Sequence, residues 1–109
     1  MAPVALERTL VKSPPELWAE IASEEALQRW LGDVRLTAAD APARVEWARP
    51  DSAGVIELTA SGWGTRVRAV AHANGVPWER VEAHRDLQRS LERLLDHLGA
   101  RSLRRGAKG

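Results

Sequence analysis

The side chains in this sequence that could carry out chemistry near neutral pH are few. The chain has three histidines, His72, His84 and His97, and no cysteine. Imidazole changes charge between about pH 5 and 8, so these residues are the first candidates for acid–base work. Their spacing does not match a metal-binding helix, and without cysteine neither a disulfide nor thiolate-ligated zinc can form. We therefore expect no metal site and no cofactor.

The serines do not form a nucleophile motif. None of Ser13, Ser23, Ser61 and Ser90 lies in a Gly-x-Ser-x-Gly sequence, and the first two are better explained as helix caps. The segment 62–64, Gly-Trp-Gly, lacks the length of a phosphate loop and the Lys that follows one, so we expect a hairpin turn there. The sequence therefore predicts no catalytic residue.

One histidine lies where it could meet a ligand. Residues 77–98 form the strongest helical pattern in the chain, and Gly99 is suited to end it. The apolar stripe of this helix comprises Val81, His84, Leu87, Leu91, Leu94, Leu95 and Leu98. On the stripe, His84 could orient a polar ligand atom, or it could be a partly buried histidine satisfied within the fold, which is the commoner case.

The elements that must position this helix begin with a strand and two short helices. Residues 4–11 alternate between apolar and polar side chains, as a half-buried strand does. Ser13, with two prolines and a glutamate directly after it, predicts the start of a helix over 14–22. Ser23 and the acids that follow it begin a second helix over 24–31.

The middle of the chain predicts antiparallel strands. On the last of them, Val67, Ala69 and Ala71 share one face, while arginines and His72 share the other. The last two strands form a hairpin that turns near Gly62. Between the short helices and the long one there is room for four strands at most, which we expect at residues 33–39, 43–48, 55–60 and 65–73.

Length and charge limit the possible functions. The chain has 109 residues and a net charge of +1, which suits one domain and gives no overall field to attract nucleic acid. We expect a single domain over 1–99 and a basic, flexible tail over 100–109. The N-terminus does not resemble a signal peptide and no stretch is long enough to span a membrane, so we expect a cytoplasmic protein.

The order of these elements resembles the START-like (SRPBCC, helix-grip) superfamily. The similar segments are 13–21, Ser-Pro-Pro-Glu-Leu-Trp-Ala-Glu-Ile, and 24–32, Glu-Glu-Ala-Leu-Gln-Arg-Trp-Leu-Gly. The hairpin over 56–67 and the closing helix over 87–98 are also similar to the family's. The resemblance covers 4–98 and implies an α+β fold in which an antiparallel sheet packs against a long C-terminal helix. Because family members usually have about seven strands in this region, we expect a shortened member.

The resemblance also implies a function, which is binding of a small hydrophobic molecule such as a lipid or a polyketide-like aromatic. We expect a pocket between the sheet and the long helix, where small alanine side chains leave space. The expected lining residues are Trp47, Val67, Ala69, Ala71, His84, Leu87 and Leu91. The alternative is a ligand-free interaction domain like the family's chaperone-ATPase activators. A polyketide cyclase-like enzyme is the third possibility, with His84 as its one candidate group.

Two further features predict contacts with other molecules. Missing strands should leave an unpaired sheet edge, and the leucine stripe is wider than a small sheet can cover, so we expect a homodimer. The alternative is a monomer in which the helices within 14–31 cover the part of the leucine stripe that the sheet leaves exposed. Trp63, in the hairpin loop, could plug the mouth of the cavity or act as a contact anchor.

Overall fold

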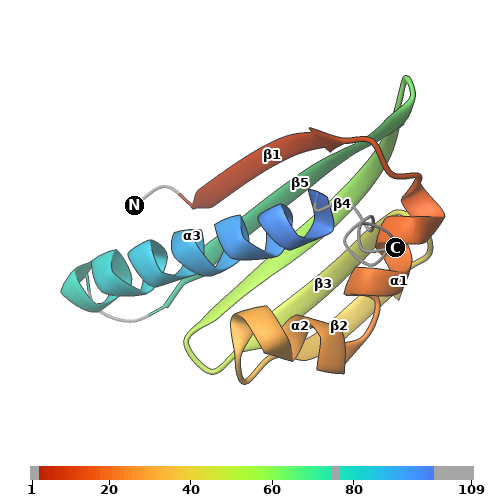
Figure 1. Cartoon of the computed structure of the whole chain (residues 1–109). Coiled ribbons are helices and arrows are strands. Elements are labelled where there is room, and N and C mark those ends of the chain that lie inside the picture. Colours follow the sequence, from red (N-terminus) through yellow and green to blue (C-terminus); the bar gives the residue numbers. More distant parts are fainter. Residues whose placement is uncertain (1–2, 75–76, 100–109) are drawn as a thin grey trace, which may run out of the picture.

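The computed structural model describes residues 3–74 and 77–99 (Figure 1). The predicted tail, 100–109, lies outside the described residues. Along the chain the elements are β1 (Val4–Leu10), α1 (Pro14–Ile21), α2 (Glu24–Leu31), β2 (Arg35–Asp40), β3 (Arg44–Arg49), β4 (Ser52–Ser61), β5 (Gly64–Ala73) and α3 (Pro77–Gly99).

The strands form one antiparallel sheet in the order β1-β5-β4-β3-β2. Helix α3 lies along one face of the sheet beside β1 and β5, and α1 and α2 cover the other half of that face (Figure 1). We call the covered face the inner face. The α+β architecture predicted from the sequence is confirmed, including the two short helices after the first strand and four strands before the long helix.

Local sequence signals set the ends of the helices. The Ser13 hydroxyl oxygen accepts a hydrogen bond from the Glu16 amide at 3.5 Å, and the Glu16 carboxylate accepts one from the Ser13 amide at 3.0 Å. This capping box lowers the pKa of Glu16, chiefly through the hydrogen bond from the Ser13 backbone. Ser23 caps α2 through the Ala26 amide, and Gly32, with φ of +74°, follows its last residue.

The long β4–β5 hairpin is confirmed, and its first strand begins earlier than expected. Ser52 already pairs with Ala73 on β5 and with Arg49 on β3, so the turn before β4 is shorter than the turn-forming sequence over 50–54 suggested. At the other end of the hairpin, Ser61 pairs with Gly64. The hairpin therefore runs the full length of the sheet.

The hydrophobic core lies between the inner face and the helices. Across the sheet, one inner row consists of Val4, Ala71, Gly54, Trp47 and Leu36, one residue from each strand. The α3 residues that pack onto this face are Leu87, Leu91, Leu94, Leu95 and Leu98, and all of them are 0% exposed. The expected surplus of leucine on α3 is therefore wrong, because a single chain already covers all five leucines, although Val81 at the start of the stripe is 39% exposed.

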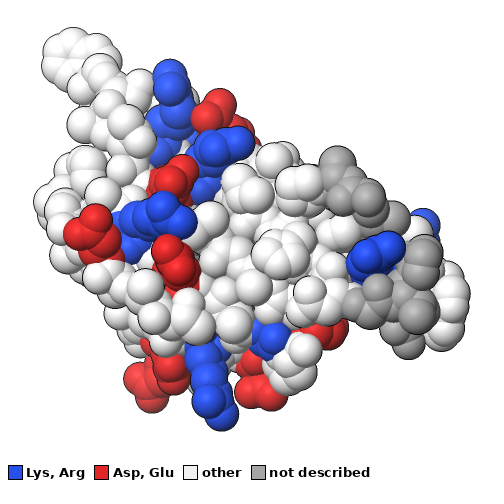
Figure 2. All heavy atoms as spheres, turned by 180° about the vertical axis from the view of Figure 1, so that it is seen from behind, with Lys and Arg blue, Asp and Glu red and all other residues white. Residues whose placement is uncertain are grey.

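The outer face of the sheet carries no helix among the described residues. In one row across this face, each strand contributes one charged residue, and the sign of the charge alternates from one strand to the next. We call it the charge row, and it consists of Glu7, Arg68, Glu57, Arg44 and Asp40. In this row, Arg44 and Glu57 form an ion pair at 3.8 Å. Figure 2, which views the molecule from behind, shows charged side chains of both signs gathered on one part of this face beside an uncharged part.

Strand β2, one of the two edge strands of the sheet, is protected against pairing with another chain. On β2, a register shift lies between Leu36 and Ala38, and the Leu36 amide donates a hydrogen bond to the Glu24 carboxylate of α2 at 3.0 Å. A bulge and a capped amide both disfavour strand addition.

Within 3–74 and 77–99, no helix is long and apolar enough to cross a membrane.

Candidate functional site

The residues predicted to line a ligand pocket lie together in the core. Trp47, Val67, Ala69, Ala71, Leu87 and Leu91 all belong to one buried cluster, and each is at most 1% exposed. Three of these residues are on β5, one is on β3 and two are on α3. The face assignments made from the sequence therefore bring the six side chains to one place, between sheet and helix.

Trp47 fills much of the space that small residues leave on the inner face. Its indole lies over Gly54, where a Cβ atom would come within 2.6 Å of the ring carbon Cζ2. Gly54 in turn pairs with Ala71, so two small residues stand beside the ring in the same row. Ala71 and Gly54 thus leave room for the Trp47 ring. The alternation of apolar and polar residues along the strands did not indicate this packing.

The indole N–H of Trp47 has no hydrogen-bond acceptor among the described residues, although the side chain is 1% exposed. A buried donor of this kind costs free energy unless a partner reaches it. The position is informative because Arg49, the next inward-facing residue on β3, lines a pocket described below. Trp47 lies two residues from Arg49 on the same face of β3, although it does not itself line that pocket.

His84, the seventh predicted residue, joins the start of α3 to the end of β5. Its Nε2 accepts a hydrogen bond from the Ala73 amide at 3.1 Å, which requires the neutral ring. The pKa of His84 is lowered, chiefly because burial desolvates the charged form, and Arg80 and His72 add repulsion. These interactions support the interpretation of His84 as a histidine satisfied within the fold.

A pocket of about 490 Å³ opens between α2, the turn from β3 to β4, and α3. It is lined by Trp30, Leu31, Gly32, Asp33, Arg49, Pro50, Asp51, Asp86 and Ser90. Its volume lies within the ~300–1,000 Å³ that small-molecule sites usually occupy. Trp30 and Leu31 supply apolar wall, whereas carboxylates and one guanidinium form the rim.

Arg49 holds this pocket in shape. Its side chain is only 12% exposed and its guanidinium donates to the Leu31 carbonyl at 3.2 Å, at the end of α2. It also forms ion pairs with Asp51 at 3.3 Å and with Asp86 of α3 at 3.8 Å. One side chain therefore ties α2, β3 and α3 together, and its nearly buried charge is compensated by two exposed carboxylates.

The remaining histidines and acids do not assemble a metal site in the part of the chain that the structure describes. His97 lies 3.0 Å from the Glu20 carboxylate of α1, and its ring is 5.0 Å from that of Trp30. These contacts tie the last turns of α3 to both short helices. His72 lies on the exposed outer face of β5.

A second hollow, of about 390 Å³, lies on the outer face of the sheet. Its lining includes Ala48, Ala53, Val55, Val70 and His72, from the uncharged part of that face, and it extends past Glu46 to Arg44 in the charge row. This surface is an open groove on bare strands, so it could accept a partner's surface more readily than enclose a small molecule.

The sequence did not single out the residues around the 490 Å³ pocket. Arg49 was placed after the end of a strand predicted over 43–48, although alternation from Trp47 would have turned it inward if the strand were one residue longer. For Asp86 and Ser90 the sequence offers no signal, because only packing of α2 against α3 brings them to a common wall.

The sequence matches no protein-family model, and no curated protein is a significant match. Several solved structures are similar in fold. Protein XoxI from Bacillus cereus is 15% identical with a TM-score of 0.71, and the match covers 91% of this chain and 94% of that one. Protein BH1534 from Bacillus halodurans is 11% identical with a TM-score of 0.70, covering 92% and 98%.

A third similar structure is protein MLL2253 from Mesorhizobium loti, 16% identical with a TM-score of 0.69, covering 89% of this chain and 93% of that chain. The names of these three proteins state no activity, ligand or partner. At such identities the likeness shows the fold alone. It agrees with the α+β architecture described above.

Proposed function

We propose that this is a shortened START-like protein that binds a small, largely apolar molecule in the cytoplasm without transforming it. The ligand would enter the 490 Å³ pocket between α2 and α3 and extend toward the core beneath α3. The residues expected from the sequence do not line this pocket in the described structure, and the ligand would reach them only by parting α3 from the sheet. They are Trp47, Val67, Ala69, Ala71, His84, Leu87 and Leu91. The class of ligand is a lipid or a polyketide-like aromatic.

The observation that carries this proposal is the unpaired indole N–H of Trp47. A ligand whose apolar body lies against Trp30 and whose oxygen atom reaches inward past Arg49 would satisfy that donor. Ligand sites in proteins commonly combine apolar walls with a few placed polar groups of this kind. We therefore expect the ligand to carry a hydrogen-bond acceptor, such as a carbonyl or hydroxyl oxygen, at the end that enters first.

The direct test is binding of palmitate and of emodin, a polyketide-like aromatic, measured by the shift in melting temperature and by tryptophan emission. A ligand that binds the folded protein raises its stability by mass action. Replacing Trp47 with Phe removes the donor and should weaken binding about tenfold, the factor that 1.4 kcal/mol of lost hydrogen bonding corresponds to. No binding by either compound would count against the ligand class.

A second pair of variants locates the site. Ser90, half-buried on α3, lines the pocket, so Ser90→Phe should fill it and abolish binding while the fold survives. Ala69, fully buried, tests how far the pocket extends beneath α3. If α3 parts from the sheet there, Ala69→Trp should be tolerated, whereas in a closed core it should destabilise by about 1–3 kcal/mol or more.

The second candidate function is a ligand-free protein-interaction domain. It is favoured by the outer-face groove of about 390 Å³, which lies on strands that no described helix covers. In that case Val55→Glu and Val70→Glu, on the outer face, would abolish partner binding. Ligand binding at the α2–α3 pocket would be unaffected by the same changes, so the two functions can be separated.

We also propose a homodimer through the free edge of β1, since α3 offers no uncovered leucine. Strand β1, of seven residues, pairs only with β5 among the described strands. Its edge is free to add a strand from a second chain. Light scattering at micromolar concentration tests this directly, because a monomer mass would overturn the dimer. A dimer that dissociates on Ala5→Pro would place the contact at the β1 edge.

A further inference from the structure

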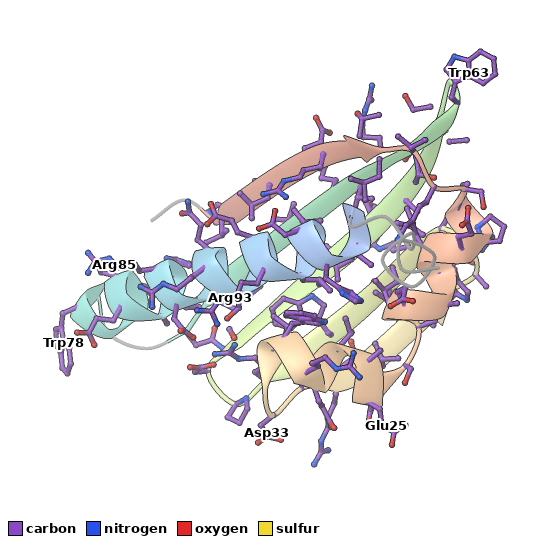
Figure 3. The ribbon with its side chains drawn as sticks, viewed as in Figure 1. Glu25, Asp33, Trp63, Trp78, Arg85 and Arg93 are labelled. Atoms are coloured by element: carbon purple, nitrogen blue, oxygen red, sulfur yellow. The ribbon has the colours of Figure 1, made fainter. Side chains whose placement is uncertain are left out.

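The tip of the β4–β5 hairpin carries a tryptophan that the fold does not require. Gly62 has φ of +58°, and no described non-glycine residue has a positive φ, so the two-residue loop is a type II′ turn. Such a turn requires glycine at its first loop position and leaves the second open to many residues. Trp63 occupies that second position and is 96% exposed. Figure 3 shows it pointing away from the body of the protein.

Val11 lies beside this turn and is also almost fully exposed, at 88%. A Cβ atom built on Gly64 would lie 3.0 Å from the Cα atom of Val11, so the segment after β1 and the hairpin loop are in close contact. The Thr65 hydroxyl donates to the Lys12 carbonyl at 2.7 Å and fixes this arrangement. Val11 and Trp63 therefore form one apolar projection, which we call the hairpin tip.

Two basic side chains lie near the hairpin tip. Lys12 directly follows Val11, and Arg66 is exposed on the outer face of β5, two residues after the loop's closing pair. On that face the nearest acids, Glu7 and Glu57, lie one row farther from the tip, in the charge row, where Arg68 stands between them. Glu16 is close enough to Lys12 for their charges to interact, but its carboxylate accepts the hydrogen bonds of the α1 cap. The tip thus combines apolar side chains with a local positive charge.

The size of the tip decides which partner it fits. A tryptophan buries about 150–250 Å², whereas a standard protein interface buries about 800 Å² on each side, so two side chains are too few for a stable protein contact. A lipid surface needs no matching shape. Tryptophan is favoured at the headgroup level of a bilayer, and basic residues are attracted to anionic lipids.

We propose that the hairpin tip inserts Trp63 and Val11 into the headgroup region of an anionic membrane, while Lys12 and Arg66 contact lipid phosphates. The attachment is peripheral, because the tip extends only one turn beyond the sheet. The overall charge of +1 does not steer the protein to membranes, so the local pair of cations and the two apolar side chains supply the attraction. This inference is independent of the ligand pocket.

Co-sedimentation with vesicles tests it, using equal parts of phosphatidylglycerol and phosphatidylcholine at low ionic strength. The wild-type protein should bind, and Trp63→Ala should weaken partitioning at least about tenfold because apolar burial is lost. The double change Lys12→Ala with Arg66→Ala should also weaken vesicle binding by the wild-type protein, and so should higher salt. Pure phosphatidylcholine vesicles should bind more weakly than the anionic mixture.

The matched control is Trp78→Ala, because Trp78 is the other exposed tryptophan, 68% exposed, and lies at the far end of α3 (Figure 3). Its removal should leave vesicle binding unchanged. The unfolding curve of Trp63→Ala should match that of the wild type, since the side chain packs against nothing. Absence of wild-type binding, equal binding to both kinds of vesicle, or equal loss in Trp78→Ala would each overturn the proposal.

Discussion

On the inner face of the sheet, Ala69, Ile56 and Val45 lie side by side on β5, β4 and β3, and none of them is exposed. On the outer face of the same strands, the charge row places Arg68, Glu57 and Arg44 next to one another. The two faces differ only by one step along each strand, because successive side chains point to opposite sides. The comparison shows how one set of strands holds a close-packed core and a solvated surface together.

The two faces should also differ in what a substitution costs. Apolar side chains under α3 lose transfer free energy and leave a cavity when they are shortened. Charged side chains on the bare face remain in water, where an ion pair contributes about 0–1 kcal/mol. Each prediction below changes one face and uses the other as its control.

The largest effect is expected beneath α3. Leu91 is 0% exposed, so Leu91→Ala should lower the free energy of unfolding by about 2–5 kcal/mol. Gln88→Ala, on the exposed side of the same helix, should change it by less than about 0.5 kcal/mol. Urea denaturation measures both. Equal effects of the two changes would mean that α3 does not pack as described.

A smaller effect should follow from a single methyl group on the inner face. A Cβ at position 54 would lie 2.5 Å from the Val70 carbonyl oxygen and 2.6 Å from the Trp47 ring. We expect Gly54→Ala to destabilise the protein by about 1–3 kcal/mol, as overpacking does. Ala53→Ser adds one atom on the outer face of the same strand and should be nearly neutral. Thermal unfolding compares the two, and a neutral Gly54→Ala would show that Trp47 is not confined.

Acid should weaken the contact of His84 at the end of the inner face. Because its pKa is lowered in the folded protein, the unfolded chain binds the proton more readily. The contribution of His84 to stability is therefore complete above its unfolded pKa of about 6.5 and is lost as pH falls through the lower folded pKa. The effect should be smaller than either packing change, since a single proton is involved.

Unfolding free energies are measured between about pH 7.5 and 5, above the range in which carboxylates such as Glu16 titrate, so that the side chains changing charge are the histidines. His84→Gln keeps an acceptor for the Ala73 amide without the titration and should flatten the pH dependence in this window. His72→Gln, on the outer face, is the control. If the dependence survives in His84→Gln, another group is responsible.

The smallest effect is expected in the charge row. Glu57 lies between Arg44 and Arg68, so Glu57→Ala should cost about 0–1 kcal/mol, and the cost should shrink as salt is added. Glu57→Lys places like charges side by side and should cost more than Glu57→Ala at low salt. Parallel denaturation curves at low and high salt test this. A salt-independent loss of several kcal/mol would mean that the outer face is covered.

Much of the fold could be predicted because its signals are local. The caps at Ser13 and Ser23, the alternation along 65–73 and the leucine stripe on α3 each depend on residues close together in the chain. The boundaries that were missed, such as the early start of β4 at Ser52, depend on pairing with Ala73 and Arg49. Such pairing partners cannot be identified when each segment of the sequence is considered by itself.

The sequence by itself therefore determined which elements form, which side of each strand and helix is apolar, and that Val67, Ala69 and Ala71 face Leu87 and Leu91. Only the tertiary structure decided how the space between them is used, because filling a volume depends on side chains from distant segments. The Trp47 ring lies over Gly54 where small residues had suggested a void, and Arg49 joins α2 to α3 around a pocket at the side.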